Sequence, residues 1–316
     1  MIVVAGEALV DLVPAGHGQE HVRPGGGPFN TARALARLGI PTAFLGHLSE
    51  DSDGQRLTDL LTGDGVDLSL ASFGPETTTV ALADLDGDGH AAYRFLVEGT
   101  SAPELTRSAM PVDLPAGVRA LHVGTLGLVL EPMATSITEL VLREAGRLVV
   151  MLDPNIRPAT LGDEGGYRRR LDSILCASAI IKASDADLEW LYPELPVEAA
   201  IARLAKGSAG LIVVTMGAGG AAGWCEGSLV SVSAPPVEVV DTIGAGDAFS
   251  AGLLAWLDEH RLLRPGFKLG RTELESALEF ACLVASLTCT RPGAEPPWRA
   301  EVDSQRKDSA RSTETA

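Results

Sequence analysis

The stretch Gly244-Ala245-Gly246-Asp247 combines residue types that could handle a transferred anionic group. It lies between a strand-like run, residues 237–240, and an apolar segment, residues 248–257, that predicts a buried helix. The small side chains leave backbone N–H groups unobstructed at the start of that helix, where the helix dipole also favours negative charge. Asp247 adds a carboxylate beside the anion. The stretch could therefore bind a phosphoryl group and deprotonate an attacking hydroxyl, although a plain tight turn would also explain it.

Polar residues beyond two other predicted strands extend the candidate site. Asp11 lies just past residues 2–5, while Asn155 and Arg157 follow residues 148–152. Folds of the α/β class bind ligands at this end of their strands, and a guanidinium suits the geometry of phosphate. The alternatives are a solvated loop aspartate and a turn whose arginine makes an ordinary salt bridge.

A glycine-rich segment near the N-terminus could approach a ligand with its backbone. Gly25-Gly26-Gly27-Pro28-Phe29-Asn30 precedes a helical stretch, residues 31–38. Glycines permit close approach, and the Asn30 amide offers both a donor and an acceptor to a polyol. A flexible loop leading into a helix that starts with proline is the competing interpretation.

The elements that must position these residues alternate regularly. Strand-like runs at 42–46, 118–123 and 210–214, with helical stretches such as 132–144 between them, predict an α/β fold. We expect a mostly parallel central sheet with helices on both faces.

A second pattern interrupts this alternation. Residues 77–84 and 91–97, joined by Asp86-Gly87-Asp88-Gly89, predict a hairpin. With residues 9–13 and 21–23, this hairpin would form a small sheet outside the main one. No linker divides the chain, so we expect one domain, residues 1–298, with the small-sheet strands from about 9–23 and 77–97 inserted. The polar tail, 299–316, is predicted to be disordered.

The composition indicates which partners and which cellular compartment to expect. The formal net charge is −17, with 42 acidic and 25 basic residues and no basic block, so a nucleic acid is not expected. The four cysteines have no C-x-x-C spacing, and the N-terminus has no basic region typical of a signal peptide. No apolar run reaches transmembrane length. We expect a cytoplasmic protein without membrane or nucleic-acid partners.

The longer run Asp-Thr-Ile-Gly-Ala-Gly-Asp-Ala-Phe-Ser-Ala-Gly, residues 241–252, resembles the C-terminal signature of the ribokinase-like (PfkB) family of sugar kinases. The Gly-Asn30 and Asp153–Arg157 motifs resemble further family patterns in matching order. The resemblance implies a ribokinase-like fold whose small sheet is a lid, with ATP and Mg²⁺ as cofactors. It also implies that Asp247 is the general base and that the amides of Gly244, Ala245 and Gly246 form the anion hole. The residues implied to position the sugar are Asp11, Gly26, Gly27, Asn30, Arg94, Asn155 and Arg157.

The nucleotide and metal sites are also implied by the resemblance. The residues expected near the nucleotide are Lys182, Ser184, Thr215, Gly217, Gly220 and Gly293. Many family members carry Asn-x-x-Glu where this chain has Ser184 and Asp187, so Asp187, with Glu189 as a competitor, is assigned to the magnesium network. Asp241 corresponds to a residue that helps to hold a monovalent cation in several relatives, which makes K⁺ a candidate.

The acceptor sugar is suggested by two segments. Residues 98–102 and 6–11 resemble fructokinases, so fructose is expected to receive phosphate on a primary hydroxyl. Ribose, 2-keto-3-deoxygluconate and a nucleoside stay open, as does a non-catalytic sugar or nucleotide sensor on the same fold. A dinucleotide-dependent oxidoreductase is disfavoured because only Gly6 follows the first strand, where G-x-G-x-x-G would be needed. Lid strands often pair between subunits in this family, which suggests a homodimer.

Overall fold

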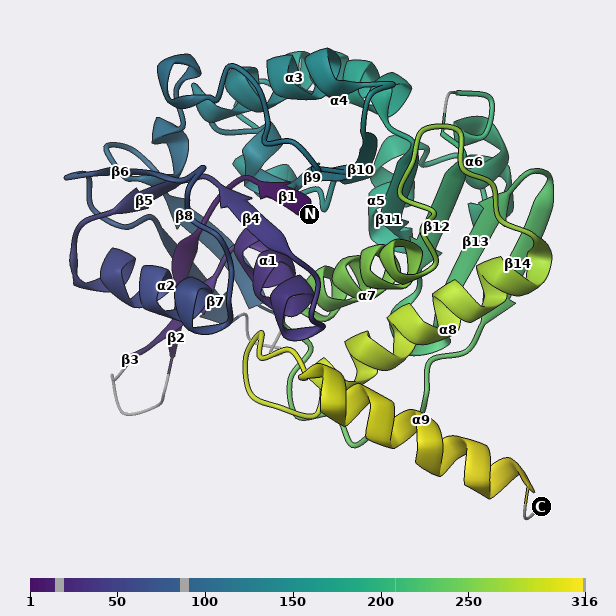
Figure 1. Cartoon of the computed structure of the whole chain (residues 1–316). Helices are drawn as coiled ribbons and strands as arrows, with labels where there is room; N and C mark the ends of the chain where they lie inside the picture. Colours follow the sequence, from purple (N-terminus) through teal and green to yellow (C-terminus); the bar gives the residue numbers. More distant parts are fainter. Residues whose placement is uncertain (15–19, 86–90, 208, 315–316) are drawn as a thin grey trace.

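The structure, a computed structural model, describes residues 1–14, 20–85, 91–207 and 209–314, and its centre is an eight-stranded sheet (Figure 1). The strand order is β14-β13-β12-β11-β10-β9-β1-β4. All neighbouring pairs from β12 to β4 are parallel, whereas β13 and β14 are antiparallel additions at one edge. The strands are β1 (Ile2–Ala5), β4 (Thr42–Leu45), β9 (Ala120–Gly124), β10 (Val149–Asp153), β11 (Ile180–Ser184), β12 (Leu211–Thr215), β13 (Ala221–Cys225) and β14 (Ser228–Val232).

Both faces of this sheet are covered, because its strands are apolar on both sides. In β1, Ile2 and Val4 join one apolar core, while Val3 and Ala5 join the other. The first core is covered by α1 (Gly27–Arg37), α2 (Ser52–Gly63), α7 (Ala245–Glu259) and α8 (Arg271–Thr288). The second is covered by α3 (Met133–Glu144), α4 (Glu164–Ala177), α5 (Asp185–Leu191) and α6 (Val197–Leu204). The predicted α/β class, with a mostly parallel sheet between two helical layers, is confirmed.

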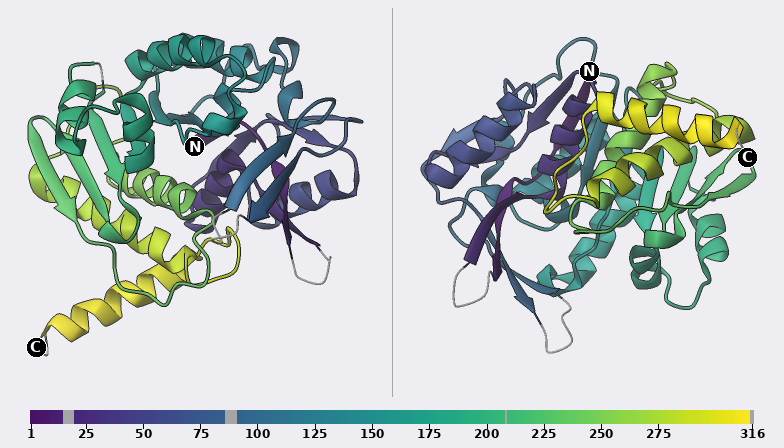
Figure 2. Two further views of the ribbon diagram at one scale, coloured as in Figure 1. Left: turned by 180° about the vertical axis from the view of Figure 1, so that it is seen from behind. Right: turned by 90° about the horizontal axis from the view of Figure 1, so that it is seen from below.

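A separate four-stranded sheet lies on the side of the molecule away from β14 (Figures 1 and 2). Its order is β3-β2-β7-β8, formed by β2 (Leu9–Pro14), β3 (Glu20–Gly25), β7 (Val80–Leu85) and β8 (Ala91–Leu96). The predicted small sheet is therefore present, and β7 pairs with β8 in antiparallel fashion. The turn predicted at Asp86–Gly89 lies outside the described residues.

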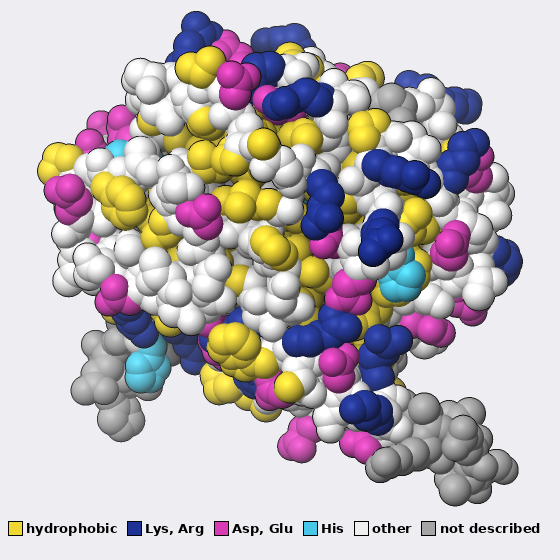
Figure 3. All heavy atoms as spheres, in the orientation of Figure 1, with side chains coloured by type: hydrophobic (Ala, Val, Ile, Leu, Met, Phe, Trp, Pro, Cys, Tyr) yellow, Lys and Arg dark blue, Asp and Glu magenta, His cyan; other side chains and the backbone are white. Residues whose placement is uncertain are grey.

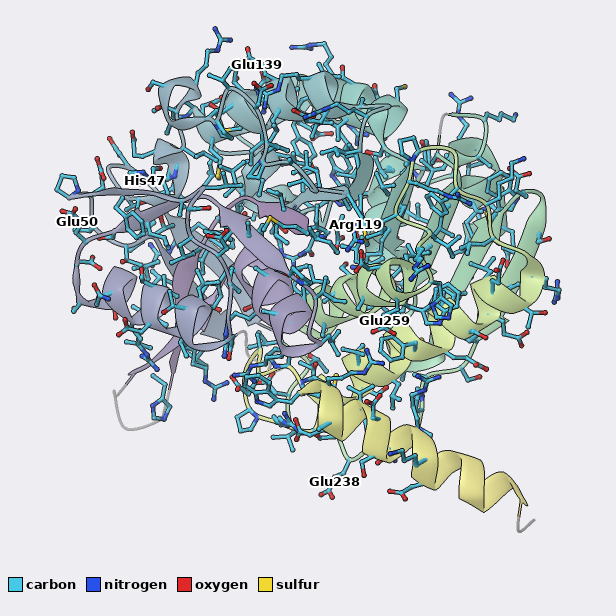
Figure 4. All side chains as sticks on the ribbon, viewed as in Figure 1. His47, Glu50, Arg119, Glu139, Glu238 and Glu259 are labelled. Carbon is cyan, nitrogen blue, oxygen red and sulfur yellow. The ribbon has the colours of Figure 1, made fainter. Side chains whose placement is uncertain are left out.

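The polar tail differs from its prediction. Residues 299–316 were expected to be disordered, but α9 (Arg299–Glu314) is helical. Its Val302 is fully buried in the first core. Its Arg299 pairs with Glu259, which is labelled at the end of α7 in Figure 4. At the start of α9, the Glu301 carboxylate accepts the Trp298 amide at 2.7 Å. One apolar anchor and these polar contacts order a segment whose composition alone indicates disorder.

The remaining elements are short. The strands β5 (His47–Ser49) and β6 (Ser72–Gly74) form a parallel pair, and η3 (Thr125–Leu128) is a 3-10 helix that follows β9. On the face shown in Figure 3, acidic and basic side chains are interspersed. Within the described ranges, no helix combines the length and the apolarity that crossing a membrane requires.

Candidate active site

Two cavities adjoin where the parallel strands end and α7 begins. They share Thr242 and Gly246 as lining residues. The first, here called the polar cavity, has a volume of about 310 Å³. It is lined by Glu7, Leu9, Asp11, Gly26, Gly27, Asn30, Phe95, Thr125, Leu126, Asn155, Arg157, Lys182, Thr242, Ile243, Gly244, Gly246 and Asp247. The second, the apolar cavity, has a volume of about 460 Å³ and lies between the β12–β13 turn, the segment before α7, and α8.

Asp247 lies in the first turn of α7 and borders the polar cavity. Its Oδ2 accepts a hydrogen bond of 2.8 Å from Asn30 Nδ2, on α1. Burial raises the pKa of Asp247 to about 6, with a smaller contribution from the Asp153 carboxylate, while Asn30, Lys182 and Arg157 oppose the rise. The carboxylate is therefore a stronger base than an ordinary aspartate and is still largely ionised at neutral pH.

The start of α7 is shaped by glycines and a buried lysine. Gly244 is the N-cap residue in a left-handed conformation with φ of 77°, and a Cβ there would lie 2.5 Å from the Ala294 side chain. A Cβ on Gly246 would lie 3.1 Å from Lys182 Nζ, so the ammonium sits directly beside this helix N-terminus. The Ala245 amide donates to the Thr242 carbonyl oxygen at 3.3 Å, which leaves the amides of Gly244 and Gly246 without a backbone acceptor among the described residues at this end of α7. Together with the helix dipole and the lysine, these two amides are suited to bind an anion.

Lys182 keeps its charge because a carboxylate contacts it. Its Nζ donates to Asp153 Oδ2 at 2.7 Å, and Ser250 Oγ donates to the same oxygen at 3.1 Å. Burial opposes the charged form of Lys182, but Asp153 outweighs that effect and raises the pKa of the lysine. Asp153 is itself buried and was not assigned a role from the sequence.

The opposite wall of the polar cavity comes from the small sheet and the N-terminus of α1. Asp11 on β2 has a pKa raised to about 6 by burial, with Arg23 opposing the rise. Gly26 is the N-cap residue of α1 with φ of 107°, and a Cβ there would lie 2.7 Å from the Glu7 carbonyl oxygen. A side chain at Gly26 is therefore excluded both by backbone conformation and by space.

Asn155 and Arg157 reach the polar cavity from the loop after β10. Asp187 holds this loop in place, because its Oδ1 accepts the Ile156 amide at 2.6 Å. Its Oδ2 accepts from the amide and the hydroxyl of Ser184, which completes a capping box at the start of α5. Both oxygens of Asp187 thus have protein donors, and Asp187 lines neither cavity.

The apolar cavity gathers three of the residues predicted near a nucleotide. Thr215, Gly217 and Gly220 line it from the turn between β12 and β13. The rest of its lining is largely apolar, namely Ala218, Ala234, Pro235, Pro236, Val237, Val239, Thr242, Ala245, Gly246, Phe249, Cys282, Ala285, Ser286 and Cys289. A flat heterocycle fits such walls, and the shared Gly246 would place its phosphate chain at the anion site.

Three of the residues predicted to bind the sugar or the nucleotide lie outside both cavities. Arg94 on β8 is exposed and does not line the polar cavity, because the pleat turns its neighbour Phe95 inward instead. Ser184 caps α5. Gly293 lies outside both cavities, where its amide donates to Asp241 Oδ2 at 2.8 Å.

Asp241 connects the small sheet to the segment before α7. Its Oδ2 accepts from Arg23 Nη1 on β3 at 2.9 Å, and its Oδ1 accepts from the Ile243 amide at 3.1 Å. Burial opposes ionisation, but the Gly293 and Ile243 amides and Arg23 outweigh it and hold the pKa of Asp241 below its usual value.

Seven residues that line the polar cavity were not among the site residues predicted from the sequence: Glu7, Leu9, Phe95, Thr125, Leu126, Thr242 and Ile243. The signal for Thr125 was available, since it follows a buried strand at the end where ligands bind. The sequence could not show whether Phe95 or Arg94 faces the cavity, because a strand pattern does not say which face is turned inward.

The combination of a doubly covered sheet, a small sheet beside a polar cavity, and a carboxylate at a helix N-terminus fits a phosphotransferase site. Residues 1–301 match the protein family described as pfkB family carbohydrate kinase. The match covers most of the chain, so the protein belongs to this family and is an ATP-dependent sugar kinase.

Individual relatives agree in sequence and in fold. The chain is 40% identical to a fructokinase of Rhizobium leguminosarum bv. trifolii over 267 residues, covering 83% of this chain and 81% of the relative. A crystal structure of fructokinase from Vibrio cholerae O395 with fructose, ADP and calcium ion bound has a TM-score of 0.85 and 28% identity, covering 96% and 97% of the two chains. A fructokinase with bound ATP from Xylella fastidiosa has a TM-score of 0.88 and 26% identity over 98% of each chain.

Proposed function

We propose that this protein transfers the γ-phosphoryl group of ATP to a primary hydroxyl of fructose. The observation that carries the proposal is the Asp247 carboxylate, which borders the polar cavity in the first turn of α7 and is fixed by Asn30. The similarity to fructokinases, one of them solved with fructose and ADP, supports fructose as the acceptor.

In this proposal, the polar cavity binds the sugar through Asp11, Asn30 and the backbone at Gly26 and Gly27. Asp247 accepts the proton of the attacking hydroxyl, an effect typically worth about 10²–10⁴ in rate. The sugar oxygen then bonds to the γ-phosphorus as the bond to the ADP oxygen breaks.

Charge on the transferred group is stabilised by fixed donors. The amides of Gly244, Ala245 and Gly246 lie at the positive end of α7, and the Lys182 ammonium lies beside Gly246. Arg157 lines the same cavity from the opposite loop. Because these groups are already in place, little reorganisation is needed when negative charge develops.

The residues present fit a divalent cation that is bound by the phosphates of ATP rather than by a cluster of protein ligands. Among the described residues, no three His, Cys, Asp or Glu side chains gather as a metal site, and both Asp187 oxygens already accept protein donors. Mg²⁺ would neutralise the phosphate charge, with Asp187 near it only through water. For K⁺, Asp241 is the implied ligand, but the Arg23 guanidinium already contacts its carboxylate, so we assign no step to K⁺.

The proposal is tested by coupled ADP production with Mg·ATP and a panel of fructose, ribose, 2-keto-3-deoxygluconate, adenosine and fructose 6-phosphate. Turnover should be greatest with fructose and absent in Asp247→Ala, whose folded state is checked by circular dichroism. If turnover is greatest with another acceptor, that acceptor replaces fructose as the proposed substrate. Sugar-dependent ADP formation retained in the variant would remove Asp247 as the base.

We also propose a homodimer formed through the small sheet. Arg94, Leu96 and Glu98 are exposed on the outer face of β8 and its continuation, and Leu96 is 46% exposed. A strand at the edge of a sheet also carries unpaired backbone groups that a second copy could satisfy.

A further inference from the structure

The polar cavity contains a backbone conformation that its residue type disfavours. Thr125 begins η3, directly after β9, and has φ of 52°. β-branched residues rarely adopt this left-handed region, because their side chains crowd the backbone. Such residues persist where the surrounding structure imposes them, and they concentrate at functional sites.

One buried carboxyl group, that of Glu7, holds this conformation. Glu7 Oε2 accepts the Gly127 amide of η3 at 3.0 Å, and Oε1 accepts the Gly27 amide of α1 at 3.1 Å. The Glu7 side chain is 1% exposed, and burial raises its pKa to about 8. Glu7 therefore joins the two turns that border the polar cavity, and the position of Thr125 relative to Gly27 is fixed.

The Thr125 hydroxyl is directed to the part of the cavity where the reacting carboxylate lies. A Cβ added to Gly27 would lie 2.5 Å from Thr125 Oγ1 and 3.3 Å from Asp247 Oδ1, so both oxygens border the same space. Asn155 Nδ2 donates to Thr125 Oγ1 at 3.5 Å, which is a long contact. In the described part of the chain, no protein acceptor is found for the hydroxyl hydrogen.

We propose that Thr125 is a specificity-determining residue whose hydroxyl donates a hydrogen bond to a sugar oxygen beside the reacting hydroxyl. The inference rests on the proposed function, because it assumes that the polar cavity binds the acceptor sugar. Glycine would satisfy the backbone at lower cost, so a strained threonine in this place indicates a use for its hydroxyl. Glu7 is a positioning residue in this arrangement.

The test compares Thr125→Val with the wild-type enzyme. Valine keeps the branching and the volume but removes the hydroxyl, so the backbone strain is matched. We expect the KM for the sugar to rise about three- to tenfold, as for one lost uncharged hydrogen bond, and the KM for ATP to stay within about twofold. Thr125→Ser should recover most of the lost sugar affinity. Thr138→Val on α3 is the matched control, because Thr138 lines neither cavity, and it should leave both constants unchanged.

A second readout separates recognition from structure. With monodeoxy analogues of the sugar, the penalty of Thr125→Val should disappear for the one analogue that lacks the partner oxygen. Thr125→Gly should melt at or above the wild-type temperature and still lose sugar affinity, because glycine relieves the strain without supplying the hydroxyl.

A failure of the inference on Thr125 can be told apart from a failure of the proposed function. If wild-type enzyme turns over sugar and Thr125→Val has the same sugar KM, the inference is overturned while the kinase function stands. An equal penalty on every deoxy analogue would also overturn it and leave Thr125 as a structural residue. If wild-type enzyme neither binds nor phosphorylates any sugar of the panel by calorimetry and ADP release, the proposed function fails first.

Discussion

The Asp247 carboxylate, which we propose as the base, is subject to opposite influences on its pKa. Burial favours the neutral form, whereas the Asn30 amide and the nearby cations favour the charged form, and the result is a pKa of about 6. A carboxylate with this pKa accepts a proton more readily than a solvated aspartate and is still deprotonated at pH 7. The hydrogen bond from Asn30 thus orients the Asp247 carboxylate and lowers its pKa by less than burial raises it.

The pH dependence of the reaction follows from this value. Because Asp247 must be ionised to accept a proton, kcat/KM should fall about tenfold per pH unit below about pH 6 and be level above it. Asp11 in the same cavity also has a pKa of about 6, so the profile should be repeated with Asp11→Asn. The acidic limb is expected to survive in that variant, and a flat profile between pH 5 and 7 would count against Asp247 as the base.

The same residue should lower the stability of the fold. Its pKa is raised from 3.8 to about 6, so below about pH 4 the carboxyl is neutral in both states and costs no stability. The loss of folding stability grows as the pH rises from about 4 and is complete once the pH has passed through about 6. Asp247→Asn should therefore be inactive yet more stable than wild type at pH 8, by up to about 3 kcal/mol. Urea denaturation at pH 8 and at pH 5 measures this, and the advantage should shrink at pH 5. An advantage that is equal at both pH values would show another cause.

At the scale of elements, Asp187 connects two parts of the site. Its carboxylate caps α5 and holds the Ile156 amide, so the loop that carries Asn155 and Arg157 is tied to the end of β11. The carboxylate is shorter than the glutamate found in many family members. In this chain both oxygens of Asp187 accept hydrogen bonds from protein groups, and Asp187 does not line the polar cavity.

Replacing Asp187 by alanine tests this assignment. We expect a loss of about 2–4 kcal/mol of unfolding free energy, since a buried cap and a loop contact are lost together. The Mg²⁺ concentration for half-maximal rate should change less than about twofold, while the KM for the sugar rises. Denaturant titration and a Mg²⁺ titration at fixed ATP measure the two effects. A large increase in the Mg²⁺ requirement with unchanged stability would support a metal ligand instead.

The sequence predicts local pieces of the site well and tertiary contacts poorly. The glycines and Asp247 at the start of α7, Asn30 after its glycines, and the loop after β10 all depend on neighbours in the chain, and the structure brings them together. The Oδ2 of Asp187 caps α5 locally through Ser184, but its Oδ1 accepts the Ile156 amide from 31 residues away, and local spacing could not reveal that second contact. The place of Thr125 after a buried strand could be seen in the sequence, but its positive φ could not, because backbone strain is a property of the folded loop.

At the scale of the whole molecule, the small sheet is connected to the segment before the start of α7. Arg23 on β3 pairs with Asp241, and the Asp241 carboxylate also accepts the Ile243 amide, which precedes the anion site by one residue. The position of the small sheet and the conformation of this segment are thereby coupled. A sheet held in place over the polar cavity would exclude water and limit futile ATP hydrolysis.

A second copy of the chain would hold this sheet more firmly, so the dimer has a consequence for function. Leu96→Arg places a charge on the exposed face of β8 and should convert a dimer to a monomer in light scattering after size exclusion. Val112→Arg is the matched control, because Val112 is 84% exposed and lies outside the small sheet. We expect the monomeric variant to have a KM for the sugar raised several-fold and an increased ATPase rate without sugar. A wild-type enzyme that is monomeric at every concentration would contradict the proposed dimer. A monomeric variant with unchanged kinetics would show that the function of the small sheet does not depend on a second subunit.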